Sequence, residues 1–218
     1  MNKKLEDRQG RVPYEYIKNI YKDKNPRQMA KSTNTEFNTC SNEIHFEFMN
    51  KDFYVKWPLG EVYFSDGSIV RSFAFKTLIL RYLVNSKGVP PSGKDLTYKE
   101  IPGGHVYYSN FYNRTIKKLS KLFESNSEGV IDTLKKMDAK KVNTGDIGFK
   151  FKFLEQIYIT LIFWRGDDEL SPSSNILFDA NIPYYFDAED LAVIGEIILY
   201  VLKNKGKLPN WKGLYKDI

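Results

Sequence analysis

The stretch that decides the fold runs from Ile157 to Asp179 and reads IYITLIFWRGDDELSPSSNILFD. It begins as the most apolar strand candidate of the chain, from Ile157 to Trp164, and it is apolar on both faces. A strand of this kind lies in the middle of a sheet and is covered on both sides. The run breaks at Gly166 into three consecutive acids, and a second apolar run then ends in another acid. We therefore expect the rest of the chain to pack around this stretch.

The segment before it has the clearest strand pattern in the chain. Four apolar residues alternate with a glycine and two lysines; the four are Ile147, Phe149, Phe151 and Phe153. A period of two is typical of a strand with one buried face. We expect Phe149–Phe153 to pair antiparallel with Ile157–Phe163 through a turn at Leu154–Gln156.

The first third of the chain has the pattern of an antiparallel meander. Residues 43–48 alternate between apolar and polar side chains, and turn signals follow at Asn50-Lys51 and Asp66-Gly67, so a short fourth strand is expected at Ile69–Val70. Helical periodicity predicts helices at 14–21, 26–33, 72–84, 110–123, 129–137 and after residue 187. Their expected N-caps include Asn25, Ser72, Ser109 or Asn110, and Asp187. Strands, then helices, then strands indicate an α+β fold: an antiparallel sheet meander plus a C-terminal strand pair, packed by several helices.

Length and composition predict one packed domain. The chain has 218 residues, of which 42% are hydrophobic and 15% aromatic, enough for a sizeable core. We expect residues 1–13 to be frayed or disordered and residues 14–218 to form a single α+β domain, with Trp211 and Tyr215 folded back onto it. No run approaches the ~18 apolar residues of a membrane span, and the first residues lack the apolar segment of a signal peptide. We therefore expect a cytoplasmic protein without a membrane partner.

Cysteine and histidine are scarce, which limits the cofactors. Cys40 is the only cysteine, so neither an intrachain disulfide nor a cysteine-ligated iron–sulfur cluster can be built from this chain alone. We expect Cys40 to be an inert or partly buried thiol. His45 lies between two glutamates on the polar face of its strand and is expected to be solvated there. His105 follows two glycines in a loop and is a ligand-binding candidate.

A loop rich in glycine and proline, the Gly/Pro loop, covers residues 87–104. Its segment Gly88–Lys94 is one residue away from a phosphate-binding loop, because Asp95 stands where Ser or Thr would ligate magnesium. A true phosphate-binding loop follows a strand and opens a helix, whereas a helix precedes this one. Two interpretations are open: a weaker anion site formed by Lys94 and nearby amides, or a rigid connection.

Four carboxylates accompany the apolar stretch, namely Asp167, Asp168, Glu169 and Asp179. Gathered together, they would bind a hard cation. One of them would otherwise have its pKa raised by the neighbouring charges and act as a proton donor. The alternative is an acidic turn that only keeps the surface polar, with Asp179 partly buried and bracing the next turn.

Several segments together resemble one protein family. They are Leu80–Leu83, Gly88–Lys94, Tyr98–Gly104, Phe111, Trp164–Leu170 and Asn175–Asp179. In this order they are similar to the family called domain of unknown function 3786, from Tyr14 to Leu202. The family occurs in anaerobic bacteria and archaea, has no assigned activity, and includes members with an added iron–sulfur module. The resemblance implies an accessory role near corrinoid, one-carbon or redox metabolism, although the single cysteine departs from the iron–sulfur members.

A ligand- or partner-binding domain is the leading expectation, because the sequence carries no catalytic signature. Its site is expected where the acidic turn (Gly166–Glu169), Asp179 and residues Gly88–Gly104 of the Gly/Pro loop converge. The ligand-binding candidates are Lys94, Glu100, His105, Trp164 and Arg165. One alternative is a metal-dependent enzyme that uses the acidic cluster and a divalent cation.

A weak nucleic-acid-binding protein is the second alternative. Residues 1–150 carry a net charge of +9 and residues 151–218 a net charge of −3. This asymmetry indicates either an anionic partner or a genome-wide bias toward lysine, asparagine and isoleucine. Eight cations of two expected helices and the tail after them would form one patch: Arg114, Lys117, Lys118, Lys121, Lys135, Lys136, Lys140 and Lys141. No aromatic side chains interleave them for base stacking, so any binding is expected to be weak and non-specific.

Overall fold

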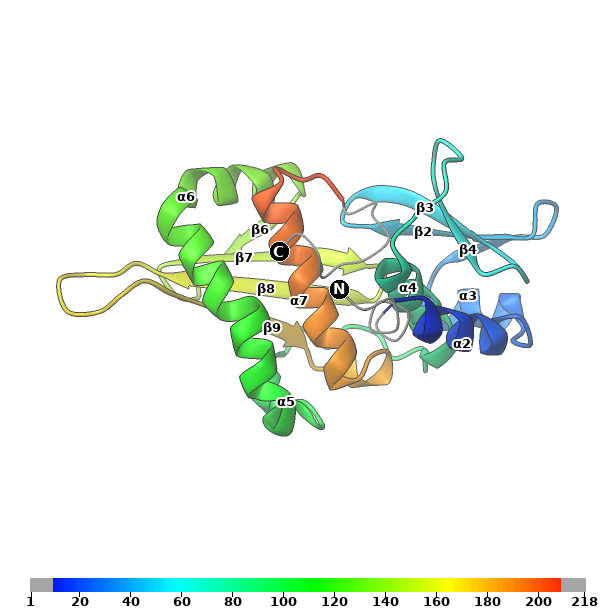
Figure 1. Ribbon diagram of the computed structural model, residues 1–218, viewed down its shortest axis with the longest axis horizontal. Coiled ribbons are helices and arrows are strands. Elements are labelled where there is room, and N and C mark those ends of the chain that lie inside the picture. The colour runs from blue at the N-terminus through cyan, green and yellow to red at the C-terminus, as the bar shows by residue number, and fades with distance from the viewer. Residues whose placement is uncertain (1–9, 209–218) are drawn as a thin grey trace.

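The protein folds into two antiparallel sheets with helices packed around them (Figure 1). The structure, a computed structural model, describes residues 10–208. The expectations for residues 1–9, Trp211 and Tyr215 fall outside this range. The α+β class is confirmed, with an antiparallel meander near the N-terminus. The C-terminal strand pair is also present, but it is the middle of a larger sheet.

The first sheet belongs to the N-terminal lobe, which we define as residues 12–85. Its elements are α2 (Val12–Tyr21), α3 (Pro26–Thr33), β1 (Glu36–Asn38), β2 (Glu43–Phe48), β3 (Lys51–Lys56), β4 (Glu61–Phe64) and α4 (Phe73–Asn85). The β2–β3 turn lies at Met49-Asn50, one residue before the expected position, because these two residues adopt the positive φ of 48° and 62° that a tight hairpin needs. Ile69, expected in a fourth strand, forms only an isolated bridge with Tyr63.

The second sheet belongs to the C-terminal lobe, which we define as residues 95–203. Its elements are β5 (Asp95–Thr97), α5 (Gly104–Phe111), α6 (Lys117–Lys136), β6 (Lys140–Val142), β7 (Ile147–Leu154), β8 (Ile157–Trp164), β9 (Ser173–Asp179) and α7 (Ala188–Lys203). The strand order is β5-β9-β8-β7-β6, so β8 is central, as its two-sided apolarity predicts. Phe151 pairs with Ile159 across an antiparallel β7–β8 turn, which confirms the expected strand pair.

The helices expected at 110–123 and 129–137 are both present, joined in one α5–α6 region that kinks between them at Asn126. It begins with α5, whose N-cap is Gly103 at φ 78°, so neither Ser109 nor Asn110 is the cap. A π-helical turn (Tyr112–Ile116) leads into α6, inside which Asn126 leaves helical geometry. The region runs on because one apolar stripe continues through it, made of buried Phe111, Ile116, Leu119, Phe123, Val130 and Leu134.

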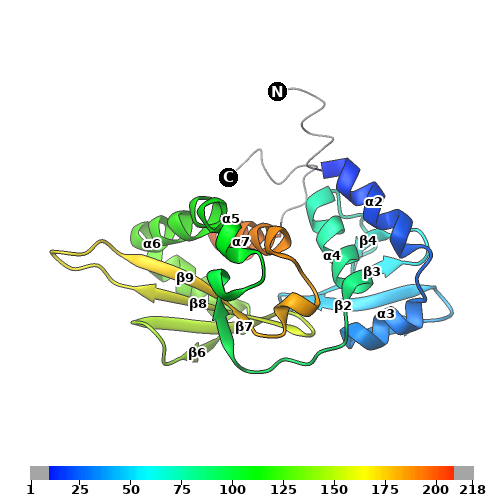
Figure 2. The same ribbon diagram turned by 90° about the horizontal axis from the view of Figure 1, so that it is seen from below.

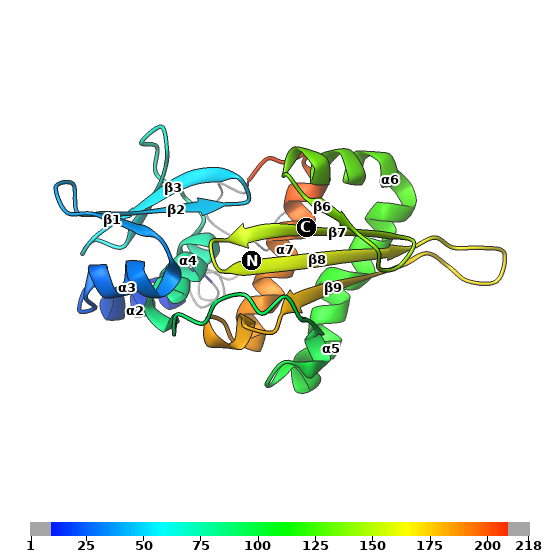
Figure 3. The same cartoon turned by 180° about the vertical axis from the view of Figure 1, so that it is seen from behind.

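The helices of the C-terminal lobe cover one face of its sheet and leave the other face open (Figure 2 and Figure 3). On the covered face, Phe123 of α6 stacks on Phe163 of β8 with 4.2 Å between ring centroids. The two lobes share one apolar core, because Phe48 of β2 packs against Phe153 of β7 at 4.8 Å. The cleft described below therefore lies between elements that are fixed to one another.

Local sequence signals position the helices. Asn25, Ser72 and Asp187 are the N-caps of α3, α4 and α7, as expected, and each side chain accepts a backbone N–H. Cys40 is exposed, so of the two states expected for it the partly buried thiol is wrong, and the inert thiol stays a prediction. None of the helices within residues 10–208 combines the length and apolarity required to cross a membrane.

Candidate functional site

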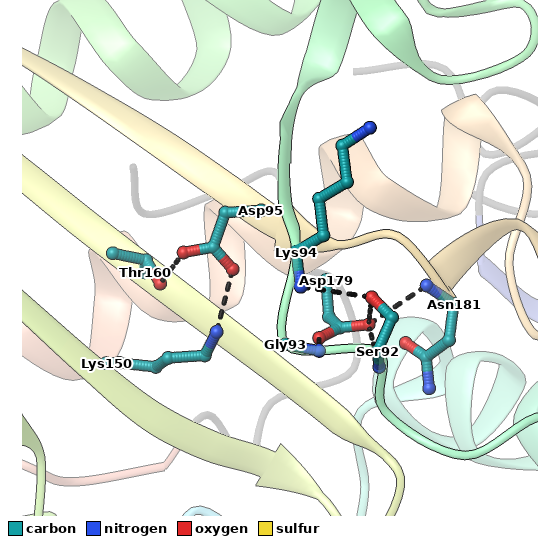
Figure 4. Close-up of polar contacts among 8 residues, drawn as sticks. All are labelled: Ser92, Gly93, Lys94, Asp95, Lys150, Thr160, Asp179 and Asn181. Atoms are coloured by element: carbon teal, nitrogen blue, oxygen red, sulfur yellow. Dashed lines mark hydrogen bonds and ion pairs between the residues drawn. The ribbon is translucent and has the colours of Figure 1, made fainter.

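Asp179 and the Gly/Pro loop meet, as the sequence predicts, but the contact is internal (Figure 4). The buried carboxylate accepts hydrogen bonds from Ser92 N (2.8 Å), Ser92 Oγ (2.9 Å), Gly93 N (2.7 Å) and Asn181 N (3.0 Å). Burial opposes ionisation, but these donors outweigh it and lower the pKa of Asp179. The loop amides therefore form an anion nest that the protein's own carboxylate fills. The side chain of Lys94 points away from it (Figure 4).

The other three carboxylates lie at the opposite end of β9. Asp167 accepts hydrogen bonds from Glu169 N (2.9 Å) and Leu170 N (2.7 Å), and these backbone donors lower its pKa. The seven residues of β9, which extend over roughly 20 Å, separate this turn from Asp179. Within residues 10–208, no group of three or more His, Cys, Asp or Glu side chains is arranged to hold a metal ion. The structure thus does not form the expected four-carboxylate site of Asp167, Asp168, Glu169 and Asp179.

The remaining ligand-binding candidates are also dispersed. Glu100 accepts two hydrogen bonds of 2.7 Å from Thr97 and closes a capping box on the short 3-10 helix Tyr98–Glu100. His105 is exposed on α5. Trp164 and Arg165 lie at the far end of β8, where Arg165 N donates to Asp146 Oδ2 at 2.7 Å. These residues do not share a site.

The open face of the second sheet carries a cluster of polar side chains that form hydrogen bonds and ion pairs with one another. Asp95 of β5 accepts hydrogen bonds from Lys150 Nζ (2.8 Å) and Thr160 Oγ1 (2.7 Å), as Figure 4 shows. Lys152 is paired with Glu47 at 2.6 Å. A broad groove of about 1130 Å³ lies over this face, but two of its lysines are already neutralised. Its other two lysines, Lys140 and Lys141, lie exposed on the edge strand β6.

A second cavity, the interlobe cleft, lies between α4 and α7 and is bordered by the α5–α6 region. Its volume of about 470 Å³ is within the range of small-molecule sites. Three elements supply its polar side chains: Thr77 and Arg81 from α4, Tyr107, Arg114 and Lys118 from the α5–α6 region, and Glu189, Asp190 and Glu196 from α7. Sequence reasoning placed Arg114 and Lys118 in the basic patch but assigned no ligand site to this cleft.

Arg81 and Asp190 form the ion pair that spans the cleft. Arg81 Nη1 donates to Asp190 Oδ1, and the side chains are 25% and 4% exposed. Burial raises the pKa of Asp190 to about 6, and the charge of Arg81 opposes this rise. The other guanidinium N–H groups of Arg81 have no hydrogen-bond partner within residues 10–208. Part of the Arg81 fork is therefore available to a ligand.

Arg114 is held in a different way. Its Nε and Nη2 donate to Glu196 Oε1 and Oε2, both at 2.8 Å, and its Nη1 donates to Tyr107 Oη at 2.9 Å. The π-helical turn carries Arg114, and α7 approaches that turn closely at Gly195: a Cβ there would lie 2.6 Å from Thr115 Cγ2. π-Helical turns are frequent at functional sites. Here the turn and the glycine fix Arg114 against α7.

Thr77 supplies the most unusual polar group of the cleft. Its side chain is buried, with 8% of the residue exposed, and Oγ1 has no hydrogen-bond partner in the part of the chain that the structure describes. A buried hydroxyl without a partner costs about 1–3 kcal/mol, and a helical threonine normally bonds the carbonyl one turn earlier. Thr77 and Arg81 are four residues apart on α4 and so lie on one face of that helix.

A weak signal for this cleft exists in the sequence. Arg81 interrupts an apolar run in α4, and Glu196 interrupts another in α7. Charged side chains are seldom buried unless they are paired, so each interruption indicates a partner. Which partner each one has depends on how α4, α7 and the α5–α6 region pack.

Comparison with known proteins adds a family and nothing more specific. The model of the family described as Domain of unknown function (DUF3786) matches residues 25–201. This range includes Thr77, Arg81, Arg114, Asp190 and Glu196. Neither the curated proteins nor the solved structures include a match to the chain.

Proposed function

The chain belongs to the DUF3786 family, and we propose that it binds a small organic anion in the interlobe cleft. The observation that carries the proposal is the buried, unpartnered hydroxyl of Thr77 one helical turn from the partly unpaired fork of Arg81. Both groups are hydrogen-bond donors. A ligand with an anionic oxygen would satisfy both at once.

The lining of the cleft indicates what kind of anion fits. A guanidinium fork matches the geometry of a carboxylate or a phosphate, and half-buried Lys118 adds a second positive charge. The remaining wall is apolar, with Ala74, Leu78 and Val193 along it. A monoanion with a short apolar body, such as an aromatic or branched carboxylate, would use both parts of this surface.

The proposal makes the protein a binding protein and not a catalyst. The metal-dependent alternative is less favoured, because its carboxylates lie at opposite ends of β9. We retain, as part of the proposal, the cytoplasmic setting and the accessory role near corrinoid, one-carbon or redox metabolism that the family resemblance implies.

Thermal unfolding with three aromatic probes tests the proposal. Benzoate, benzamide and benzylamine have similar shapes and are anionic, neutral and cationic, respectively. A ligand that binds only the folded state raises the melting temperature by mass action. We expect millimolar benzoate to raise it more than the other two probes. Arg81→Met should abolish the difference, whereas Lys117→Met, which removes an exposed charge outside the cleft, should preserve it.

Thr77→Val provides a second, independent readout. The substitution removes the unpartnered hydroxyl with little change of shape, so we expect the free protein to become more stable by about 1 kcal/mol. Affinity for benzoate should fall at the same time, because a donor is lost. A valine variant that binds benzoate as tightly as the parent would remove Thr77 from the site. In the experiment with three probes, equal shifts of the melting temperature with benzoate, benzamide and benzylamine would overturn the proposal itself.

A further inference from the structure

We infer that a proton on Asp190 controls anion binding in the interlobe cleft, because the Asp190 carboxylate and the ligand compete for Arg81. The inference rests on the proposed function and adds regulation to it. In this scheme, Asp190 occupies Arg81 while it is ionised. When Asp190 takes up a proton, the Arg81 charge becomes available to the anion.

The two oxygens of Asp190 have different partners. Oδ1 accepts from Arg81 Nη1, and Oδ2 accepts from the backbone N–H of Asp187 at 3.5 Å in the capping box of α7. Asp190 N in turn donates to Asp187 Oδ1 at 2.9 Å. The capping box keeps the backbone of Asp190 at the start of α7, with its carboxyl beside Arg81. The carboxyl can, however, lose its charge.

The charges around Asp190 favour proton uptake when an anion enters. Its own helix contributes Asp187 and Glu189, and both carboxylates act on Arg81 together with Asp190. Across the cleft stand Tyr107, Lys118 and the Arg114–Glu196 pair. Since that pair is neutral as a unit, three acids at the start of α7 face one guanidinium and one lysine. Electrostatic repulsion from these acids therefore disfavours the binding of an additional anion until one of the acids is protonated.

Asp190 is the acid that takes up this proton, because burial raises its pKa to about 6. Below that pH it is already protonated, and affinity for an anion is at its highest. Above that pH, binding must take up a proton, so affinity falls by up to about tenfold per pH unit. An anion bound beside Asp190 raises the pKa of that carboxyl further, by the reciprocity of linkage.

Calorimetric titration with benzoate at about pH 5.5, 6.5 and 7.5 tests the inference, because a carboxylate of ordinary pKa stays ionised throughout this range. For the parent protein we expect affinity to fall as pH rises. Two buffers with different ionisation enthalpies should reveal an uptake approaching one proton per benzoate at the highest pH. Asp190→Asn should bind benzoate about equally at all three values and more tightly than the parent at the highest. Glu189→Gln, a change at the neighbouring rim carboxylate, should retain the pH dependence.

The outcomes separate the inference from the proposed function. Binding by the parent without proton uptake, or an Asp190→Asn variant that keeps the pH dependence, would overturn the inference and leave anion binding intact. Absence of benzoate binding at every pH would overturn both. If Asp190→Asn does not fold, the proton uptake of the parent in two buffers decides the question without that variant.

Discussion

At the scale of single residues, the buried charged side chains of this protein form ion pairs and hydrogen bonds with specific partners. Lys76 is almost completely buried, pairs with Glu61 at 3.1 Å, and lies 4.2 Å from the centre of the Tyr14 ring. Glu61 also accepts from Tyr14 Oη at 2.7 Å. These contacts fasten α2, β4 and α4 together. Glu155, in the β7–β8 turn, has a less complete set of partners.

We predict that Glu155→Gln stabilises the protein most at alkaline pH. One carboxylate oxygen accepts from Glu47 N, while the other is buried without a partner among the described residues. Burial raises the pKa of Glu155 to about 7. The folded state therefore binds this proton more tightly than the unfolded chain, and stability is lost as pH rises from about 4.5 to 7. Denaturant unfolding should show glutamine gaining about 2 kcal/mol more at pH 8 than at pH 5. A gain independent of pH would contradict this account.

We predict that Gly195→Ala destabilises the contact that positions Arg114. A Cβ at this position would lie 2.6 Å from Thr115 Cγ2, and Thr115 is held by a hydrogen bond to Phe111 O at 2.6 Å. Overpacking of this kind costs about 1–3 kcal/mol. The double variant Gly195→Ala/Thr115→Ser, which removes the clashing methyl group, should recover part of the loss in urea unfolding. Equal midpoints for parent and Gly195→Ala would show that α7 and the π-helical turn are less tightly packed.

At the scale of elements, β8 organises the C-terminal lobe. It is the middle strand of the second sheet, and Ile159 and Leu161 are fully buried on its covered face. The hairpin that links β8 to β9 carries the acidic turn, and the other end of β9 fastens the Gly/Pro loop. The acidic turn and the Gly/Pro loop, which were expected to converge, are therefore kept apart by the whole length of β9.

We predict that Ile159→Asp prevents stable folding or costs several kcal/mol, because it buries a charge without a partner. Tyr158→Asp is the matched control. Tyr158 is on the opposite, open face of the same strand and is half-buried, so its replacement should cost much less. Circular dichroism melts of both variants give the comparison, and similar losses would show that the two faces of β8 are equally buried.

We predict that Asp179 stabilises the Gly/Pro loop and does not bind a cation. Its carboxylate already has four donors, so millimolar magnesium or calcium should leave the melting temperature unchanged. Asp179→Asn should lower stability, because an amide oxygen replaces a carboxylate that accepts all four hydrogen bonds. The lowered pKa means that this stabilisation is present above the unfolded pKa and is lost as pH falls through the folded value. A cation-dependent rise that disappears in Asp179→Asn would restore the metal hypothesis.

At the scale of the whole molecule, the expected basic patch does not form a single surface. Arg114 is engaged by Glu196. Lys117 and Lys121 lie before the kink of α6 at Asn126, whereas Lys135 and Lys136 lie beyond it, and the two parts of α6 run in different directions (Figure 1). The positive charge is divided between two regions. Each of them offers a polyanion only a few contacts.

We therefore predict weak and sequence-independent nucleic-acid binding that is lost near physiological salt. With few phosphate contacts, the affinity changes by roughly 0.9 log unit per log unit of salt for each contact. A gel-shift titration of duplex and single-stranded DNA at two salt concentrations measures this. Tight, sequence-selective binding at the higher salt would contradict the proposed function and favour the nucleic-acid hypothesis.

The sequence by itself determined the secondary elements and their pairing wherever the pattern was local. The alternation of β7, the two-sided apolarity of β8 and the caps at Asn25, Ser72 and Asp187 all appear in the structure as expected. Such features depend on neighbours within a few residues, so periodicity and capping chemistry are sufficient to predict them. The break that the pattern predicts between 123 and 129 appears as the kink at Asn126, whereas the earlier start of the region at Gly104 was not predicted.

Only the tertiary structure decided which polar residues meet. Asp179 was expected to meet both the acidic turn and the Gly/Pro loop, but the structure forms the loop contact alone, with Ser92 and Gly93 more than eighty positions earlier in the chain. Arg81 meets Asp190 over a still longer separation. Side-chain type and spacing carry no information about such distances, because the packing of α4 against α7 sets them. The interlobe cleft could be recognised only after that packing was known.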